Sequence, residues 1–160
     1  MTNNEKNNKC AVENTIFEEC NFDVDIFIEK HGESRKLVKS EAKIFKSFCE
    51  TAVMFKLDRI ILGSGRSCCK TCIFKTNNSS WVIWETDERR GFYNALCFDN
   101  IYDACQGIFR NYLEGENVAN AIKHFNMHID EETPEASLID FASKIDYTYT
   151  PVATRKKERK

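Results

Sequence analysis

Hydrophobic and polar positions follow one clear pattern over residues 80–115. Residues 81–86 are aromatic and β-branched, which is typical of a strand, and the polar residues 87–91 end in glycine, as hairpin loops often do. Residues 92–98 alternate with large side chains on both faces and predict a second strand. Apolar residues then recur at helical spacing over 101–113, which predicts a helix packed on the sheet.

The ends of this predicted helix carry the usual signals. Asp99 is expected to cap its start, and Asp103 adds negative charge in the first turn. Gly115 is expected to end it.

Two further strands are predicted near the N-terminus. Residues 23–29 alternate polar and apolar side chains, which indicates a strand with Val24, Ile26 and Ile28 inward and Phe27 outward between acids. Residues 35–38 would form a short return strand. Before them, residues 12–20 fit a short helix, and residues 1–11 are expected to be a disordered lead.

The middle of the chain predicts a helix and a third strand of the sheet. Ser40 is expected to cap a helix that runs to about residue 56, with Glu41 in its first turn. Residues 57–62 continue either as the helix end or as a separate short segment. Residues 69–75 read as a strand that would join 81–86 and 91–98 in an antiparallel meander.

Two more helices are predicted after Gly115, the first over 118–129. Thr133 and Pro134 are a typical start for the second, which would reach residue 145. The fold class is therefore predicted as α+β, an antiparallel β-meander with helices packed on it. We expect one domain over residues 12–146 and a tail over 147–160.

Charge is distributed unevenly along the 160 residues. The net charge of the chain is −2, but residues 155–160 carry five positive charges and one negative charge, so the other 154 residues carry −6. An acidic body favours a basic partner. The basic hexamer has no interleaved aromatic residues, so nucleic acid is not the expected partner. No apolar leader and no long apolar run is present, which predicts a cytoplasmic protein without a membrane span.

Eight cysteines raise the question of metal or thiol chemistry. In the cytoplasm they are expected to be reduced. Cys68, Cys69 and Cys72 contain a Cys-x-x-Cys pair, but a zinc site usually needs a second pair, which the sequence lacks. Buried, inert thiols are the favoured interpretation, and a metal-binding or redox role for Cys68, Cys69 and Cys72, with Cys69 and Cys72 as the metal ligands, is the alternative.

Other motifs give no candidate for catalysis. His124 and His128 are four residues apart on a predicted helix, but the glutamate that would make them a metalloprotease motif is missing. Gly63-Ser64-Gly65 is too short for a nucleophile elbow. We therefore expect a protein that is not an enzyme and needs no cofactor.

A cluster of acidic and aromatic residues is the remaining signal. Glu85, Asp87 and Glu88 lie at a strand end and loop beside Trp84 and Tyr93. Acidic charge accelerates association with a basic partner and aromatic anchors slow its dissociation. These five residues, together with Asp25 and Phe27 of the acidic N-terminal strand, are the predicted binding residues. The alternative is that the aromatic side chains belong to the core.

The central unit resembles small bacterial immunity proteins of polymorphic toxin and contact-dependent inhibition systems. The resemblance rests on Trp-Val-Ile-Trp-Glu-Thr-Asp-Glu-Arg-Arg-Gly at 81–91, on Phe98-Asp99 and on Asp103-Ala104-Cys105. It covers about residues 23–115 and is strongest over 81–113. It implies a non-enzymatic protein that stays in the producing cell and neutralises a cognate toxin domain by binding it. Many such toxins are basic nucleases, which suits an acidic body. The extra Arg90, the extra cysteines and the helices after Gly115 depart from the pattern. A structural or adaptor domain with no toxin partner is a third alternative.

Overall fold

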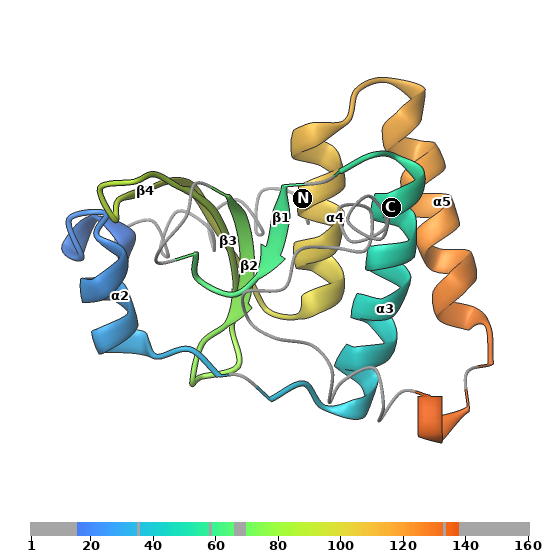
Figure 1. Cartoon of the computed structure of the whole chain (residues 1–160), viewed down its shortest axis with the longest axis horizontal. Helices are drawn as coiled ribbons and strands as arrows, with labels where there is room; N and C mark the ends of the chain where they lie inside the picture. Colours follow the sequence, from blue (N-terminus) through green and yellow to red (C-terminus); the bar gives the residue numbers. More distant parts are fainter. Residues whose placement is uncertain (1–15, 35, 58, 66–69, 133, 138–160) are drawn as a thin grey trace, which may run out of the picture.

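The chain folds into an α+β structure, which confirms the predicted fold class. The computed structural model describes residues 16–34, 36–57, 59–65, 70–132 and 134–137. Four strands form one mixed sheet of order β1-β2-β3-β4, with α2 on one face and α3 and α4 on the other (Figure 1). The elements are α2 (Val24–His31), α3 (Lys39–Met54), β1 (Ile60–Leu62), β2 (Thr71–Lys75), β3 (Trp81–Thr86), β4 (Phe92–Phe98), α4 (Ile101–Tyr112) and α5 (Glu116–Asp130).

The predicted antiparallel meander is present as β2, β3 and β4. The sheet is nevertheless not strictly antiparallel, because β1 pairs with β2 in parallel. The segment 57–62, whose structure the sequence left open, provides this strand. All three residues of β1 are buried, and strands buried on both faces typically consist of consecutive apolar residues.

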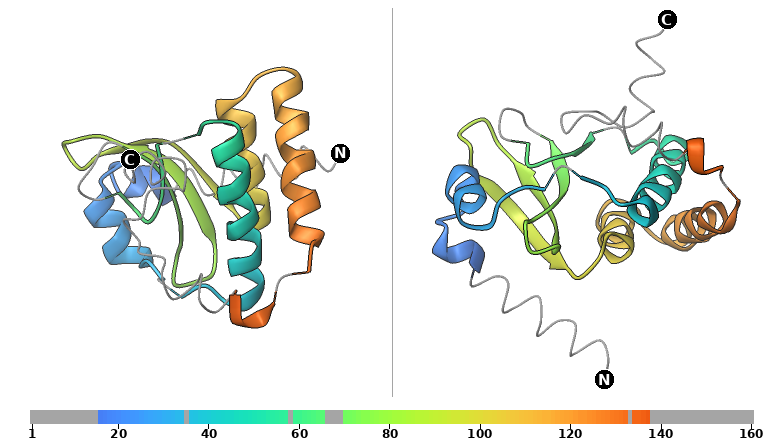
Figure 2. Two further views of the ribbon diagram at one scale, coloured as in Figure 1. Left: turned by 45° about the vertical axis from the view of Figure 1, so that its right-hand side comes forward. Right: turned by 90° about the horizontal axis from the view of Figure 1, so that it is seen from below.

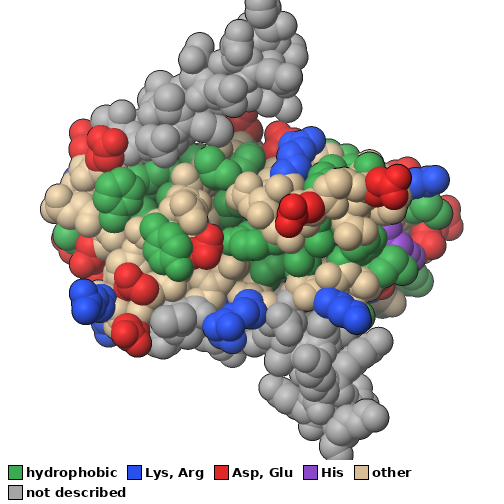
Figure 3. Space-filling model, turned by 90° about the horizontal axis from the view of Figure 1, so that it is seen from above, with side chains coloured by type: hydrophobic (Ala, Val, Ile, Leu, Met, Phe, Trp, Pro, Cys, Tyr) green, Lys and Arg blue, Asp and Glu red, His purple; other side chains and the backbone are tan. Residues whose placement is uncertain are grey.

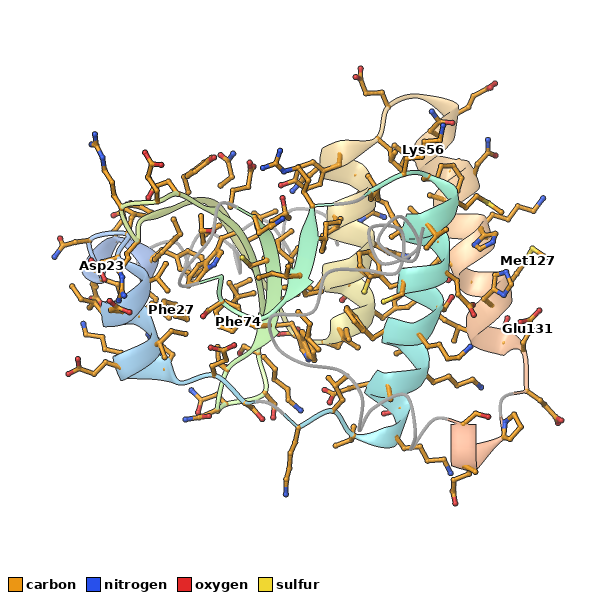
Figure 4. The ribbon with its side chains drawn as sticks, in the orientation of Figure 1. Asp23, Phe27, Lys56, Phe74, Met127 and Glu131 are labelled. Carbon is orange, nitrogen blue, oxygen red and sulfur yellow. The ribbon has the colours of Figure 1, made fainter. Side chains whose placement is uncertain are left out.

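The predicted strand over 23–29 is wrong, because residues 24–29 belong to α2 and Asp23 precedes it. Asp23 caps the helix, since its carboxylate accepts a hydrogen bond from the backbone N–H of Ile26 at 3.1 Å. Gly32 ends it in a left-handed conformation with φ +77°. Val24 and Phe27, three residues apart, form the buried face of the helix. Phe27 therefore points inward, opposite to the prediction, and faces Phe74 of the sheet (Figure 4).

The predicted return strand over 35–38 is also absent from its described residues. Residues 36–38 have no regular structure, and only Ser34 makes an isolated bridge to β2. The next helix, α3, begins at Lys39 after the capping residue Val38. Glu41 takes the role expected of Ser40, because its carboxylate accepts the backbone N–H of Val38 at 3.0 Å.

A β-bulge interrupts β4 and changes which side chains share a face. Glu85 pairs with Tyr93 and Ile83 pairs with Leu96, so two residues of β4 oppose one residue of β3. Asn94 in the bulge has φ +55°, a conformation that Asn adopts more readily than most residues. The uninterrupted alternation predicted for 92–98 is therefore wrong.

The bulge divides the large side chains of β4 between two hydrophobic layers. Phe92 stacks on Trp84 at 3.9 Å between ring centroids, in the layer under α2. Phe98 lies on the opposite face and packs against Gly107 of α4. The layer under α2 is mainly aromatic and contains Phe17, Phe27, Phe74, Trp84 and Phe92.

Three helices build the other layer. The helix α4 packs on β3 and β4 as predicted, and α5 packs on α3 and α4 on the side away from the sheet (Figure 2). Phe48, Phe109 and Phe125 meet there, one from each helix. The cap of α4 is Asn100, one residue after the predicted Asp99, and the helix ends before Gly115, which instead precedes α5.

Several predictions fall on residues outside the described part of the chain. They concern the lead over 1–11, the first part of the helix over 12–20, residues 138–145 of the last predicted helix and the tail over 147–160, and they stay predictions. Residues 16–19 and 135–137 are helical, in agreement with the two helices predicted there. Among the described residues, no helix is both long and apolar enough to cross a membrane.

Candidate functional site

A groove opens at the end of the sheet face that carries α4. It encloses about 390 Å³ and lies between the turn after α3, the start of β2 and the paired strands β3 and β4. Apolar and aromatic side chains form a band across this side of the molecule, with acidic groups inside the band and basic groups at its edges (Figure 3). We call this hollow the tyrosine groove; its principal side chains are Lys56, Arg59, Lys70, Glu85, Tyr93 and Tyr112.

Tyr112 and Glu85 form the centre of the tyrosine groove. The Tyr112 hydroxyl accepts a hydrogen bond from Thr71 at 3.1 Å and is within hydrogen-bonding reach of the Glu85 carboxylate. Burial raises the pKa of Tyr112 to about 12; the neighbouring Glu85 charge acts in the same direction, and the Thr71 hydrogen bond opposes it. The phenol is therefore neutral at physiological pH and can act as a hydrogen-bond donor.

Glu85 also connects the groove to a second hollow. Its carboxylate accepts a hydrogen bond from the Asn94 amide at 3.0 Å, and cross-strand pairing places Tyr93 beside it. The second hollow, of about 380 Å³, lies on the other side of the Glu85–Tyr112 pair and is also lined by Leu96 and Asn111. Tyr93 is 47% exposed and Tyr112 is 37% exposed, so both rings are accessible to a ligand or partner.

Three basic residues also line the groove. Lys56 follows the end of α3 (Figure 4), Arg59 precedes β1 and Lys70 precedes β2. Among the described residues, no ion pair involves Lys56 or Lys70. The backbone of Lys56 has φ +60°, a left-handed conformation that glycine adopts without strain. Lysine at this position therefore has a conformational cost.

The acidic hairpin lies beside the groove, and its residues have different roles. Asp87 accepts hydrogen bonds from the backbone N–H groups of Arg89 and Gly91 at 2.9 and 3.0 Å, so it holds the loop in shape. Glu88 is exposed. Asp25 of α2 forms an ion pair of 2.6 Å with Arg90, which ties α2 to the hairpin.

The structure therefore separates the predicted binding residues into two groups. Glu85, Asp87, Glu88 and Tyr93 lie together on the β3–β4 hairpin, and Asp25 is joined to it through Arg90. Trp84 and Phe27 are 1% and 3% exposed and belong to the aromatic layer under α2, which corrects the expectation that they form part of the surface. The indole N–H of Trp84 is satisfied by the carbonyl of Ser64 at 2.9 Å.

The cysteine motif is described only in part. Cys68 and Cys69 lie outside the described residues, and Cys72 is buried in β2. Its Sγ lies 3.6 Å from the Lys70 carbonyl oxygen. Within the described ranges, no group of three or more His, Cys, Asp or Glu residues is placed to hold a metal ion.

The two histidines lie between α3 and α5. His124 Nδ1 is 2.7 Å from the hydroxyl of Thr51, which donates to the Ser47 carbonyl, so the ring nitrogen acts as the donor. His128 is 2.9 Å from Glu131. These contacts tie α5 to α3 and to its own end.

Sequence reasoning missed the contribution of Tyr112, Lys56 and Lys70. Tyr112 fitted the apolar stripe of the predicted helix, and only its position at the last turn could have suggested an exposed ring. The two lysines come from segments distant from the hairpin, and no local pattern indicates that the fold brings them to it.

Comparison of the chain with known protein families, with curated proteins and with solved structures finds no significant match in any of the three.

Proposed function

We propose that the protein is an immunity protein that binds a basic toxin domain and neutralises it by stoichiometric contact. The observation that carries the proposal is the exposed Tyr93 next to Glu85 and Tyr112, beside an acidic hairpin. Exposed tyrosines are common anchors of protein interfaces because they bury a large area at a small entropic cost. The resemblance of residues 81–113 to immunity proteins and the net charge of −6 outside the basic end support the same assignment.

The groups of this surface would act at different stages of binding. Exposed acids such as Glu88 would attract a basic partner and accelerate association. Tyr93 would be buried in the complex and would control its dissociation. Asp87 is less suitable as a test of charge, because its carboxylate holds the hairpin loop.

Binding kinetics with the toxin domain encoded by the neighbouring gene test the proposal. Glu88→Lys should slow association and weaken its dependence on salt, while leaving the melting temperature unchanged. Tyr93→Ala should speed dissociation and cost about 2 kcal/mol of binding free energy. Glu132→Lys makes the same charge change at an exposed residue beyond α5 and should leave binding unchanged. The same variants are scored for growth rescue in cells that express the toxin.

If Glu88→Lys and Tyr93→Ala both bind the toxin and protect cells as the wild type does, the hairpin surface is not the binding site. The acidic start of α2, with Asp23, Asp25 and Glu29, would then be the next surface to test. If no toxic domain is encoded beside the gene, the proposal loses its partner.

A metal-binding or thiol-redox role for Cys68, Cys69 and Cys72 is the second candidate. Burial of Cys72 with its sulfur near a backbone carbonyl argues for an inert thiol. The purified, reduced protein is therefore expected to contain substoichiometric zinc. One zinc per chain, lost on Cys69→Ser or Cys72→Ser, would favour this second candidate.

A further inference from the structure

We propose that the second hollow, of about 380 Å³, receives an arginine side chain of the basic partner protein. The inference rests on the proposed function for the identity of the partner, and it adds which side chain of that partner is bound and where. Three features carry it: a carboxylate without a cationic partner, a lining that is otherwise uncharged, and the carboxyl end of helix α4.

Glu85 supplies the charge of the second hollow. Among the described residues that line the hollow, it alone is charged; the others are Asn94, Ala95, Leu96, Asn111 and Tyr112. The Tyr112 hydroxyl stays neutral at physiological pH, because its pKa is raised to about 12. Glu85 is partly buried, and no ion pair involves it in the part of the chain that the structure describes. A carboxylate in this setting attracts a cation more strongly than a fully exposed one, because less water screens it.

Neutral donors hold the Glu85 carboxylate in place. The Asn94 amide donates to Glu85 Oε2 at 3.0 Å. The Thr71 hydroxyl donates to the Tyr112 oxygen at 3.1 Å, which leaves the Tyr112 hydrogen for Glu85. These donors orient the carboxylate without neutralising it. A carboxylate can accept about four hydrogen bonds, so acceptor sites remain for a ligand.

The end of α4 adds a second preference for a cation. Asn111 and Tyr112 are the last two residues of the helix, where unpaired backbone carbonyls create a partial negative charge. Arg110 of the same turn bonds to Gln106 at 3.3 Å and is not among the residues that line the hollow. The Asn111 side chain has no hydrogen-bond partner among the described residues, so its amide oxygen can accept a bond from a ligand.

An arginine side chain fits these features better than a lysine side chain. A guanidinium has five N–H donors in one plane, so it can bond to Glu85 and to the Asn111 amide oxygen while it stacks on the Tyr112 ring, which is 37% exposed. Ala95 and Leu96 offer apolar contact to its methylene groups. The ammonium of lysine is a compact, strongly hydrated charge and lacks the planar surface for stacking.

NMR titration of the full chain at low salt tests the hollow without the toxin. The probe is Nα-acetyl-arginine amide, which should shift the amide signals of Asn94 and Asn111 with a dissociation constant on the order of 1–10 mM. The citrulline analogue has the same shape without the charge, and the lysine analogue has the charge without the guanidinium plane. Each should bind at least about fivefold more weakly than the arginine derivative.

Two variants change the hollow without removing a buried group. Glu85→Gln keeps the shape and an acceptor for Asn94 but removes the charge, so it should lower the affinity for the arginine derivative about tenfold. Asn111→Lys puts a competing cation at an exposed position where the helix end favours one. It should fold at least as well as the wild type and also lose binding. Glu88→Gln makes the same chemical change as Glu85→Gln outside the hollow and should leave the affinity unchanged.

Binding kinetics with the toxin domain connect the hollow to the partner. Glu85→Gln and Asn111→Lys should speed dissociation of the complex about tenfold, because they remove a buried charged contact. Glu88→Gln should act mainly on association.

Four results would overturn the inference. The first is the absence of shifts with the arginine derivative at up to about 50 mM. The second is binding of the citrulline or lysine analogue as tight as that of arginine. The third and fourth are unchanged affinity for the arginine derivative, or unchanged dissociation of the toxin, in both hollow variants when circular dichroism shows that they are folded.

The inference and the proposed function fail in different ways. A wild-type chain that binds no toxin domain refutes the proposed function. A wild-type chain that binds the toxin with the same kinetics as Glu85→Gln refutes only the arginine site.

Discussion

Glu41 in the first turn of α3 forms an ion pair with Lys75 at the end of β2, with 2.8 Å between Oε1 and Nζ. Both side chains are largely withdrawn from solvent, at 16% and 8% exposure. The other oxygen of Glu41 accepts the indole N–H of Trp81 at 3.2 Å. One carboxylate therefore caps α3 and joins it to two strands of the sheet.

Removing the Glu41 carboxylate should be strongly destabilising. Glu41→Ala leaves the Lys75 ammonium and the Trp81 N–H buried without their acceptor, which should cost about 3 kcal/mol of unfolding free energy. Urea denaturation measures the change. Lys39→Ala breaks the exposed pair with Glu135 and should change the stability much less than Glu41→Ala does. Equal effects of the two substitutions would contradict the role given to Glu41.

Truncation of Phe109 should open a cavity between the helices. The side chain is fully buried and contacts Phe48 and Phe125, each at 5.4 Å between ring centroids. Phe109→Ala should therefore cost about 3–5 kcal/mol. Met127→Ala, on the exposed side of α5, should leave the melting temperature nearly unchanged and serves as the control. An unaltered melting temperature for Phe109→Ala would mean that α4 does not pack as described.

The bulge residue Asn94 should tolerate glycine but not a β-branched side chain. Its φ of +55° is accessible to glycine without strain, whereas valine would be strained by about 1–2 kcal/mol. Thermal denaturation of Asn94→Gly and Asn94→Val measures the difference. Ala95→Val changes the neighbouring position and controls for volume. Equal stability of the two Asn94 variants would indicate that the bulge is absent in solution.

His124 should make the protein less stable in mild acid. Burial, and then the charge of His128, lower the pKa of His124 below its ordinary 6.5, while Glu50 and Glu131 partly oppose the shift. The unfolded chain therefore binds a proton more readily than the folded one. The stabilisation is present above pH 6.5 and is lost as the pH falls through the lowered pKa.

Unfolding experiments between pH 7.5 and 5 measure this loss. His124→Asn retains a side-chain donor for Thr51 without a titrating ring, so its stability should fall less over the same interval. Identical profiles for wild type and His124→Asn would exclude His124 as the group responsible.

The central meander was predictable because its local signals agree. Strand-forming residues, a glycine-ended loop and one long apolar stripe all occur within 80–115. The helix α2 was not predictable in the same way, since its residues alternate like a strand and only Asp23 and Gly32 mark helix ends. Burial of Phe27 under an aromatic sheet face decided between the two.

The candidate site was only half predictable. Glu85 and Tyr93 are close in the hairpin, so sequence reasoning could place them together. Tyr112, Lys56 and Lys70 reach the same groove through tertiary packing, which no local pattern encodes. Trp84 was misplaced because an aromatic residue in a strand has the same sequence signal whether it is buried or exposed.

Because of the bulge in β4, the site depends on the number of residues in this strand as well as on their identity. The extra residue opposite β3 puts Tyr93 on the same side as Glu85 and leaves Phe92 in the aromatic layer. Losing one residue there would exchange these two rings between core and surface while every remaining side chain stays chemically intact. Single insertions and deletions in this hairpin are therefore a more direct route to altered recognition than point substitutions, for evolution and for protein engineering alike.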